Sequence, residues 1–146
     1  MKKSTQIIWW VFRIVLGLLM LLGALAHVTN SKEGAMADSA FITAMVKTGY
    51  LWPIIGAIEL SAGVAILAGR FMPLALIVLA PITLNILLFH LSNPSHLDGI
   101  AIALAIIVPH LGLAWLYREH FAVLFKQNAA LFDATTTTQT INSRAG

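Results

Sequence analysis

The stretch "YLWPIIGAIELSAGVAILAGRFMPLALIVLAPITLNILLFHL", residues 50–91, decides the fold of this chain. It contains two apolar runs, at about 51–69 and 72–91, separated by the short turn-forming segment "GRFMP". A helix needs about 20 predominantly apolar residues to cross the hydrocarbon core of a bilayer, and each run has that length. Tyr50 and Trp52 stand at the start of the first run, where amphipathic aromatic side chains anchor a membrane helix at the interface. The stretch therefore predicts two antiparallel transmembrane helices.

Two further apolar runs, at about 7–26 and 97–117, complete a set of four candidate spans. The chain of 146 residues is 59% hydrophobic and 10% charged, whereas a soluble domain is roughly 45–50% apolar and about 25% charged. We therefore predict an all-α integral membrane four-helix bundle. The "ALA" at 24–26 resembles a signal-peptidase site, but the run before it is about 20 residues long, beyond the roughly 7–15 of a signal peptide, and contains Arg13. We expect it to be retained as a span.

Two segments outside the spans have their own signals. "DSAFITAMVKTGY", residues 38–50, has an apolar stripe at helical spacing, a capping residue at Asp38 or Ser39, and Gly49 at its end. We predict a short amphipathic helix there, lying in the membrane interface between the first two spans. Residues 127–146 lose apolar periodicity and are expected to form a disordered cytoplasmic tail. The four-span domain is then residues 1–126.

The basic residues predict the orientation of the chain in the membrane. Seven of them lie on the membrane side that holds the two termini, or just inside the span in the case of Arg13: Lys2, Lys3, Arg13, Arg70, Arg118, Lys126 and Arg144. The opposite side holds Lys32 and Lys47. Positive residues collect on the cytoplasmic side, so both termini are predicted to be cytoplasmic. Because the nine Lys and Arg residues mostly flank the spans, the net charge of +3 reflects membrane topology, and we expect the lipid bilayer, not nucleic acid, as the partner.

Motifs for independent catalysis are missing from the sequence. There is no cysteine, which excludes a disulfide, a thiolate metal site and a dithiol relay within this chain. Neither metal-ligand spacing, nor a phosphate-binding glycine loop, nor a nucleophile elbow is present. We therefore expect no metal site, and an accessory subunit is more consistent with the sequence than an enzyme in its own right.

Polar side chains within the spans are the candidate ligand-binding residues, since ionisable groups in a membrane commonly mark functional sites. They are Arg13, Glu59, Asn85, His90 and His110. Helical spacing places Arg13 on one stripe with Gly17, Met20, Ala24 and His27, and Glu59 on another with Gly56 and Gly63. Both stripes are expected to face into the bundle, because small residues allow close helix packing.

The charged and polar groups suggest partners for one another. Arg13 is the predicted partner of Glu59, and Asn85 is predicted to be buried and to act with Glu59 across the bundle. His90 is placed at the outer mouth, at about 140° from Asn85 around the helix. His27 and the loop residue His96 are expected near the same mouth. All these groups also fit a purely structural role, in which they hold helices together. His27 and His90 would meet the geometry of a two-histidine haem, but we consider haem the weaker alternative.

With these residues in view, the chain resembles the DoxX family of small four-span bacterial membrane proteins. The resemblance rests on "RIVLGLLMLLGALAH" in the first span, on the "IEL…GR…LAP…N…FH" series through the next two, and on "WLYREHFAVLF" after the fourth. His27 departs from the pattern, since a lysine is expected there in many relatives. The resemblance implies a redox-associated accessory role in the bacterial cytoplasmic membrane, beside an oxidoreductase partner subunit. We expect a quinone-like ligand near Glu59, Asn85 and His90, because an amide and an imidazole supply hydrogen-bonding groups for the quinone carbonyls within an apolar slot. A non-enzymatic scaffold or small-solute carrier is the alternative, and the oligomeric state stays open.

Overall fold

The computed structural model describes residues 3–29, 39–92 and 97–124. These ranges form helices only, in the chain order α1 (Lys3–Val28), α2 (Ala40–Lys47), α3 (Leu51–Ala68), α4 (Met72–Ser92), α5 (Leu97–Leu116) and α6 (Arg118–Leu124). The first span begins earlier than the sequence predicted, at Lys3 instead of Ile7. His96 and the predicted tail at 127–146 lie outside the described residues.

Four helices of the described part are long and apolar enough to cross a membrane: α1, α3, α4 and residues Gly99–Leu116 of α5. Their outward faces carry large apolar side chains such as Leu22, Val64 and Leu111, which are more than half exposed on the isolated chain. Such faces are stable against lipid and not against water. The predicted all-α four-helix membrane fold is therefore confirmed.

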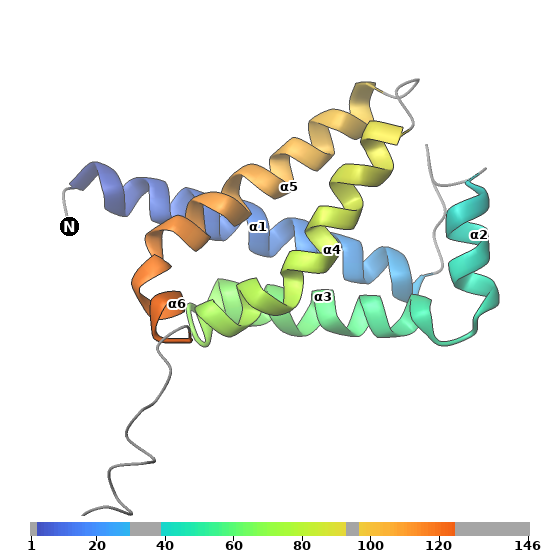
Figure 1. Ribbon diagram of the computed structural model, residues 1–146, viewed down its shortest axis with the longest axis horizontal. Helices are drawn as coiled ribbons and strands as arrows, with labels where there is room; N and C mark the ends of the chain where they lie inside the picture. The colour runs from blue at the N-terminus through green and yellow to red at the C-terminus, as the bar shows by residue number, and fades with distance from the viewer. Residues whose placement is uncertain (1–2, 30–38, 93–96, 125–146) are drawn as a thin grey trace, which may run out of the picture.

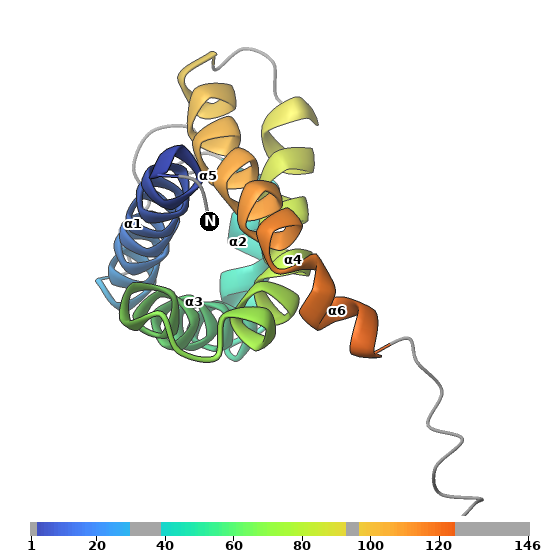
Figure 2. The ribbon, with the colours of Figure 1, turned by 90° about the vertical axis from the view of Figure 1, so that its left-hand side faces the viewer.

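The long helices pack as a closed ring, in which α1 contacts α3 and α5, and α4 contacts the same two helices. Figure 1 shows α1 and α3 lying alongside one another, whereas α4 and α5 run obliquely to them, toward the upper right of the view. Seen along the bundle, the ring encloses a common centre, and α2 lies across its far end (Figure 2). The core that fills this ring contains fully buried apolar side chains from all four helices: Leu16, Met20, Ile66, Leu76, Leu79 and Leu113.

Small residues bring α1 and α3 together. A Cβ added to Gly63 would lie 3.2 Å from the carbonyl oxygen of Gly17, so the two backbones approach closely at this point. The predicted inward stripes are confirmed: Arg13, Gly17, Met20 and Ala24 are buried on α1, and Gly56, Glu59 and Gly63 are buried on α3. This close packing holds the polar residues of both helices inside the bundle.

The turns follow from local sequence chemistry. Gly69 ends α3 in the left-handed conformation, with φ +68°, which glycine adopts without a steric penalty. Helix α2 begins where predicted, because the Ser39 Oγ accepts a hydrogen bond from the Ile42 amide at 3.3 Å. Gly49, with φ +77°, follows its end. These two turns set α4 antiparallel to α3 and turn α2 across the end of the bundle (Figure 1).

Candidate functional site

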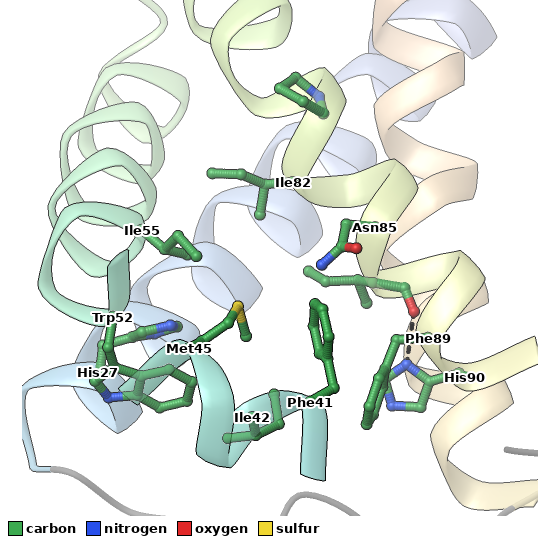
Figure 3. Close-up of a pocket in the computed structure, with 12 residues that line it drawn as sticks. His27, Phe41, Ile42, Met45, Trp52, Ile55, Ile82, Asn85, Phe89 and His90 are labelled. Carbon is green, nitrogen blue, oxygen red and sulfur yellow. Dashed lines mark hydrogen bonds between the residues drawn. The ribbon is translucent and has the colours of Figure 1, made fainter. Parts of the chain in front are cut away.

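An apolar cavity of about 240 Å³ lies at the end of the bundle that α2 covers. Its walls come from four helices, and α2 contributes Phe41, Ile42 and Met45. The remaining lining residues are His27 from α1, Trp52 and Ile55 from α3, and Pro81, Ile82, Asn85, Ile86, Phe89 and His90 from α4. Figure 3 shows His27 and Trp52 on one side of this space and Asn85, Phe89 and His90 on the other, with Phe41 and Met45 between them.

Three polar side chains converge on this apolar space: His27, Asn85 and His90. The sequence predicted that Asn85 and His90 face apart and meet different neighbours, but both line the same cavity. The prediction that Asn85 is buried is wrong, because Asn85 belongs to the exposed residues, and His90 is the buried one of the two, at 6% exposed. The physical reason is the neighbouring helix: Gly99 of α5 has no side chain and lies directly against the His90 ring.

Glu59 lies behind the cavity wall and not in it. Its carboxylate is 3% exposed, and its Oε2 lies 3.3 Å from the Nδ1 of His27. Two glycines make room for this pair: a Cβ on Gly23 would come within 2.6 Å of the Glu59 Oε2, and one on Gly56 within 2.6 Å of the His27 Cβ. Glu59 therefore reaches the cavity through His27, and the predicted direct cooperation with Asn85 across the bundle is not the observed arrangement.

Trp52 supports the His27 ring on the cavity side. The two ring centroids are 4.1 Å apart, with the planes inclined by 37°. The Trp52 Nε1, a donor, and the Glu59 Oε2, an acceptor, are both buried, and neither makes a hydrogen bond within the described part of the chain. The His27 side of the cavity thus has the Trp52 ring in its wall and the buried Glu59 carboxylate behind it.

Arg13 does not pair with Glu59, which corrects the sequence prediction. Its Nε donates a hydrogen bond to the Ile66 carbonyl at 2.7 Å, and its Nη2 donates to the Leu67 carbonyl. Ile66 is seven residues beyond Glu59, which is about 10 Å along the helix. The guanidinium therefore binds carbonyls in the last turn of α3, where a positive charge is also favoured by the helix dipole.

Aromatic side chains enclose the Arg13 guanidinium on its other sides. Its central carbon lies 4.7 Å from the ring centroids of both Trp9 and Trp10. The carbonyls and the rings together compensate for the burial of this charge. Arg13 is thus placed at the opposite end of α3 from the cavity.

His110 is also separate from the cavity. It is 5% exposed within α5, and its Nδ1 is buried without a hydrogen-bond partner in the described residues. Of the five candidate residues predicted from sequence, the structure brings Asn85 and His90 to one cavity, places Glu59 one side chain away, and leaves Arg13 and His110 elsewhere.

Sequence reasoning missed the residues that give the cavity its shape. His27 was expected near the interface, although its position on the inward stripe of α1 was the signal that it contacts α3. Phe41 and Phe89, whose ring centroids are 5.9 Å apart, come from helices that are distant in sequence. No local pattern indicates such a contact.

The fold and this site define a multi-pass α-helical membrane protein with a small, mostly apolar cavity at one end of its bundle. A family model, DoxX, matches residues 8–91. This match covers α2 and α3 completely, all of α4 except its last residue, and most of α1, which is more than half of the chain. The chain therefore belongs to the DoxX family. No curated protein and no solved structure matches the chain.

Proposed function

We propose that this protein is a redox-associated accessory subunit of the bacterial cytoplasmic membrane that binds a quinone-like ligand in the cavity between α2, α3 and α4. The observation that carries the proposal is the convergence of an amide and two imidazoles on a cavity whose other walls are apolar and aromatic. Small-molecule sites have this composition, with few polar groups that orient the ligand within a mostly apolar space.

The cavity walls suit a flat ring with polar substituents. Phe41, Trp52 and Phe89 provide aromatic surfaces, and aromatic rings pack favourably against one another in offset or edge-on arrangements. Asn85, His27 and His90 supply hydrogen-bonding groups at the edges of the space. The volume of about 240 Å³ lies below the roughly 300–1,000 Å³ typical of drug-sized ligands. It therefore favours a single ring system, such as a quinone headgroup, over a haem macrocycle.

The accessory role follows from the chemistry that the chain lacks. Its sequence has no cysteine for thiol chemistry, and the described residues hold no cluster of three or more His, Asp or Glu side chains suited to a metal ion. A quinone exchanges electrons only with a redox partner. We therefore infer that an oxidoreductase subunit supplies or removes those electrons, while this chain holds the ligand.

The proposed orientation has both termini in the cytoplasm. The absence of cysteine makes it testable with single-cysteine variants. A membrane-impermeant maleimide added to intact spheroplasts should label Lys47→Cys, which ends α2, but should label Arg70→Cys, in the turn before α4, only after lysis. The reverse pattern would show that the termini lie outside.

Quinone binding is tested on the purified protein in lipid nanodiscs. Wild-type protein should carry extractable quinone, or bind an added short-chain quinone, and Asn85→Leu and His90→Leu should each weaken that binding about 10-fold, as the loss of one good hydrogen bond does. His110→Gln is the matched control, because this buried histidine lies outside the cavity. Wild-type protein that neither contains nor binds quinone would refute the proposal.

The alternative is a scaffold or solute carrier, and one observation favours it: Arg13 and Glu59 both contact neighbouring helices directly. In that case Glu59→Gln and Asn85→Leu would lower thermal stability and membrane accumulation, and any redox readout would fall only in proportion to the protein level. Solute flux in proteoliposomes would separate the carrier from the scaffold.

A further inference from the structure

A second hollow lies at the end of the bundle opposite the cavity. It has a volume of about 640 Å³ and is lined by the first turns of α1 and by residues around the junction of α5 and α6. Figure 1 shows the start of α1 and this junction at one end of the molecule, with α2 at the other end. We call this hollow the terminal groove, and its main lining residues are Thr5, Gln6, Trp9, Trp10, Tyr117 and Arg118.

Contacts among the helices fix the two indole rings of the terminal groove. The Trp9 Nε1 donates a hydrogen bond to the Tyr117 hydroxyl at 3.3 Å, which joins α1 to the α5–α6 junction. The Trp9 and Trp10 rings meet edge to face, with centroids 5.0 Å apart. Each ring also lies 4.7 Å from the central carbon of Arg13, whose guanidinium is bound to α3. The groove is therefore already formed without a ligand, which lowers the entropic cost of binding one.

The terminal groove lies at the level where a membrane helix meets water. Both α1 and α5 are candidate spans, and the groove is at their ends. Tryptophan and tyrosine concentrate at this level in membrane proteins. Along α1, Thr5 and Gln6 lie nearer to the end of the helix, and Trp9 and Trp10 lie one turn further into the span. A ligand with a polar head and apolar chains, such as a phospholipid, fits this order of side chains.

Arg118 gives the terminal groove a donor suited to phosphate. Its side chain is 55% exposed. Its Nη1 donates to the Trp115 carbonyl at 3.2 Å, and its central carbon lies 5.2 Å from the Trp115 ring centroid. Its Nη2 is 4.0 Å from the Oε1 of Glu119, which is itself 87% exposed. A guanidinium has five N–H donors, so these contacts leave donors for a phosphate, which arginine binds through two parallel hydrogen bonds.

The charges around the terminal groove favour an anion. Among the described residues at this end of the bundle, Lys3, Arg70 and Arg118 are exposed cations, and Glu119 is an exposed carboxylate. Lys3 stands three residues before Gln6, so it lies on the same side of α1. These cations attract a phosphate whose charge is not balanced, whereas they repel the ammonium group of a zwitterionic headgroup.

We propose that the terminal groove binds an anionic phospholipid, with the phosphate beside Arg118, Thr5 and Gln6 and the acyl chains against Trp9 and Trp10. Basic pockets between transmembrane helices bind lipid headgroups in this way. The terminal groove shares no residue with the cavity, so the lipid site does not depend on the proposed function.

Tryptophan fluorescence tests the site, because three of the four tryptophans lie at this end of the bundle: Trp9, Trp10 and Trp115. Full-length protein with Trp115→Phe, which removes the one outside the groove, is reconstituted in phosphatidylcholine vesicles. Phosphatidylglycerol or phosphatidylcholine with brominated acyl chains is then added, since bromine quenches a tryptophan that it contacts. We expect phosphatidylglycerol to bind beside Trp9 and Trp10 about 5-fold more tightly than phosphatidylcholine, the effect of one Lys or Arg near an anionic lipid. Equal quenching by the two lipids would overturn the proposal.

Charge variants locate the lipid preference. Arg118→Gln should bring the two lipids close to equal affinity. Arg70→Gln is the matched control, because it removes the same charge at the same end of the bundle but lies outside the groove, and it should keep most of the preference. Equal losses in both variants would overturn the proposal, since they would show a general attraction to the surface. Glu119→Gln should increase the preference for phosphatidylglycerol, and a partial loss of folded protein cannot produce such a gain.

A competition experiment separates the lipid from a free anion. Inorganic phosphate, exchanged for chloride at constant ionic strength, should leave the quenching by brominated phosphatidylglycerol unchanged, because it lacks the acyl chains that contact the indole rings. Displacement of the lipid by inorganic phosphate would overturn the proposal and show that the terminal groove holds a free anion.

Discussion

The Nδ1 of His27 lies 3.3 Å from the Oε2 of Glu59, and this contact joins α1 to α3 at the back of the cavity. Both groups are enclosed by helix packing, and Gly23 and Gly56 provide the space they occupy. The pair therefore serves the packing of two spans as well as the cavity wall. Its structural contribution can be measured separately from any ligand.

Replacing one member of the His27–Glu59 pair should lower the free energy of unfolding more than replacing both. His27→Leu leaves the Glu59 carboxylate buried without its partner, and breaking a buried pair in this way costs about 3–5 kcal/mol. We expect the double variant with Glu59→Leu to recover part of that loss. Unfolding midpoints of the two single variants and the double variant, in one detergent, give the coupling between the two sites. If the losses of stability in the two single variants simply add up in the double variant, the His27–Glu59 contact contributes nothing to stability.

Gly23→Ala tests the space that the carboxylate needs. The new Cβ would lie 2.6 Å from the Glu59 Oε2, so the carboxylate must move. Alanine is otherwise favoured over glycine within a helix by about 1 kcal/mol. We expect Gly23→Ala to lower the unfolding midpoint of the wild-type protein, but to raise it in a Glu59→Ala background, where the collision is absent. A loss of stability in both backgrounds would mean that another contact restricts Gly23.

Much of this fold could be predicted from sequence because membrane spans are local signals. Length and hydropathy identify the four long helices, and the small-residue stripe around Gly63 shows which face of α3 meets α1. Ser39 and Gly49 mark the limits of α2 in the same local way. These features depend only on residues close together in the chain.

The pairing of polar groups could not be predicted, because it depends on how far one helix lies along another. Arg13 and Glu59 are both buried on facing stripes, but the offset between α1 and α3 brings Arg13 to the Ile66 carbonyl and His27 to Glu59. The burial of His90 was likewise not predicted, since it depends on Gly99 of the next helix. Helical periodicity gives the angle of a side chain and not the axial offset between two helices.

Arg13 should be important for stability through its hydrogen bonds to α3. Hydrogen bonds from a charged group contribute about 1.5–3 kcal/mol each, so Arg13→Leu should lower the unfolding midpoint substantially. Arg13→Lys should recover only part of the loss, because a lysine ammonium cannot reproduce the fork that reaches the Ile66 and Leu67 carbonyls. Arg118→Leu is the control, since its side chain is exposed, and it should change stability by less than about 0.5 kcal/mol. If Arg13→Lys has the unfolding midpoint of the wild-type protein, the positive charge of Arg13 stabilises the fold without its two hydrogen bonds.

Helix α2 should control ligand affinity through its stability, because it supplies Phe41, Ile42 and Met45 to the cavity. Ser39→Ala removes the cap on the Ile42 amide, and losing such a cap costs about 1 kcal/mol. We expect faster hydrogen exchange at the amides of 40–47 and weaker binding of the short-chain quinone proposed as a ligand. Exchange in α3 and α4 should stay unchanged. Ser61→Ala is the control, because Ser61 is exposed and, among the residues that the structure describes, its hydroxyl donates to the Ile58 carbonyl of its own helix. If ligand affinity falls in Ser39→Ala without any change in exchange at 40–47, the helix acts on the cavity in some way other than through its stability.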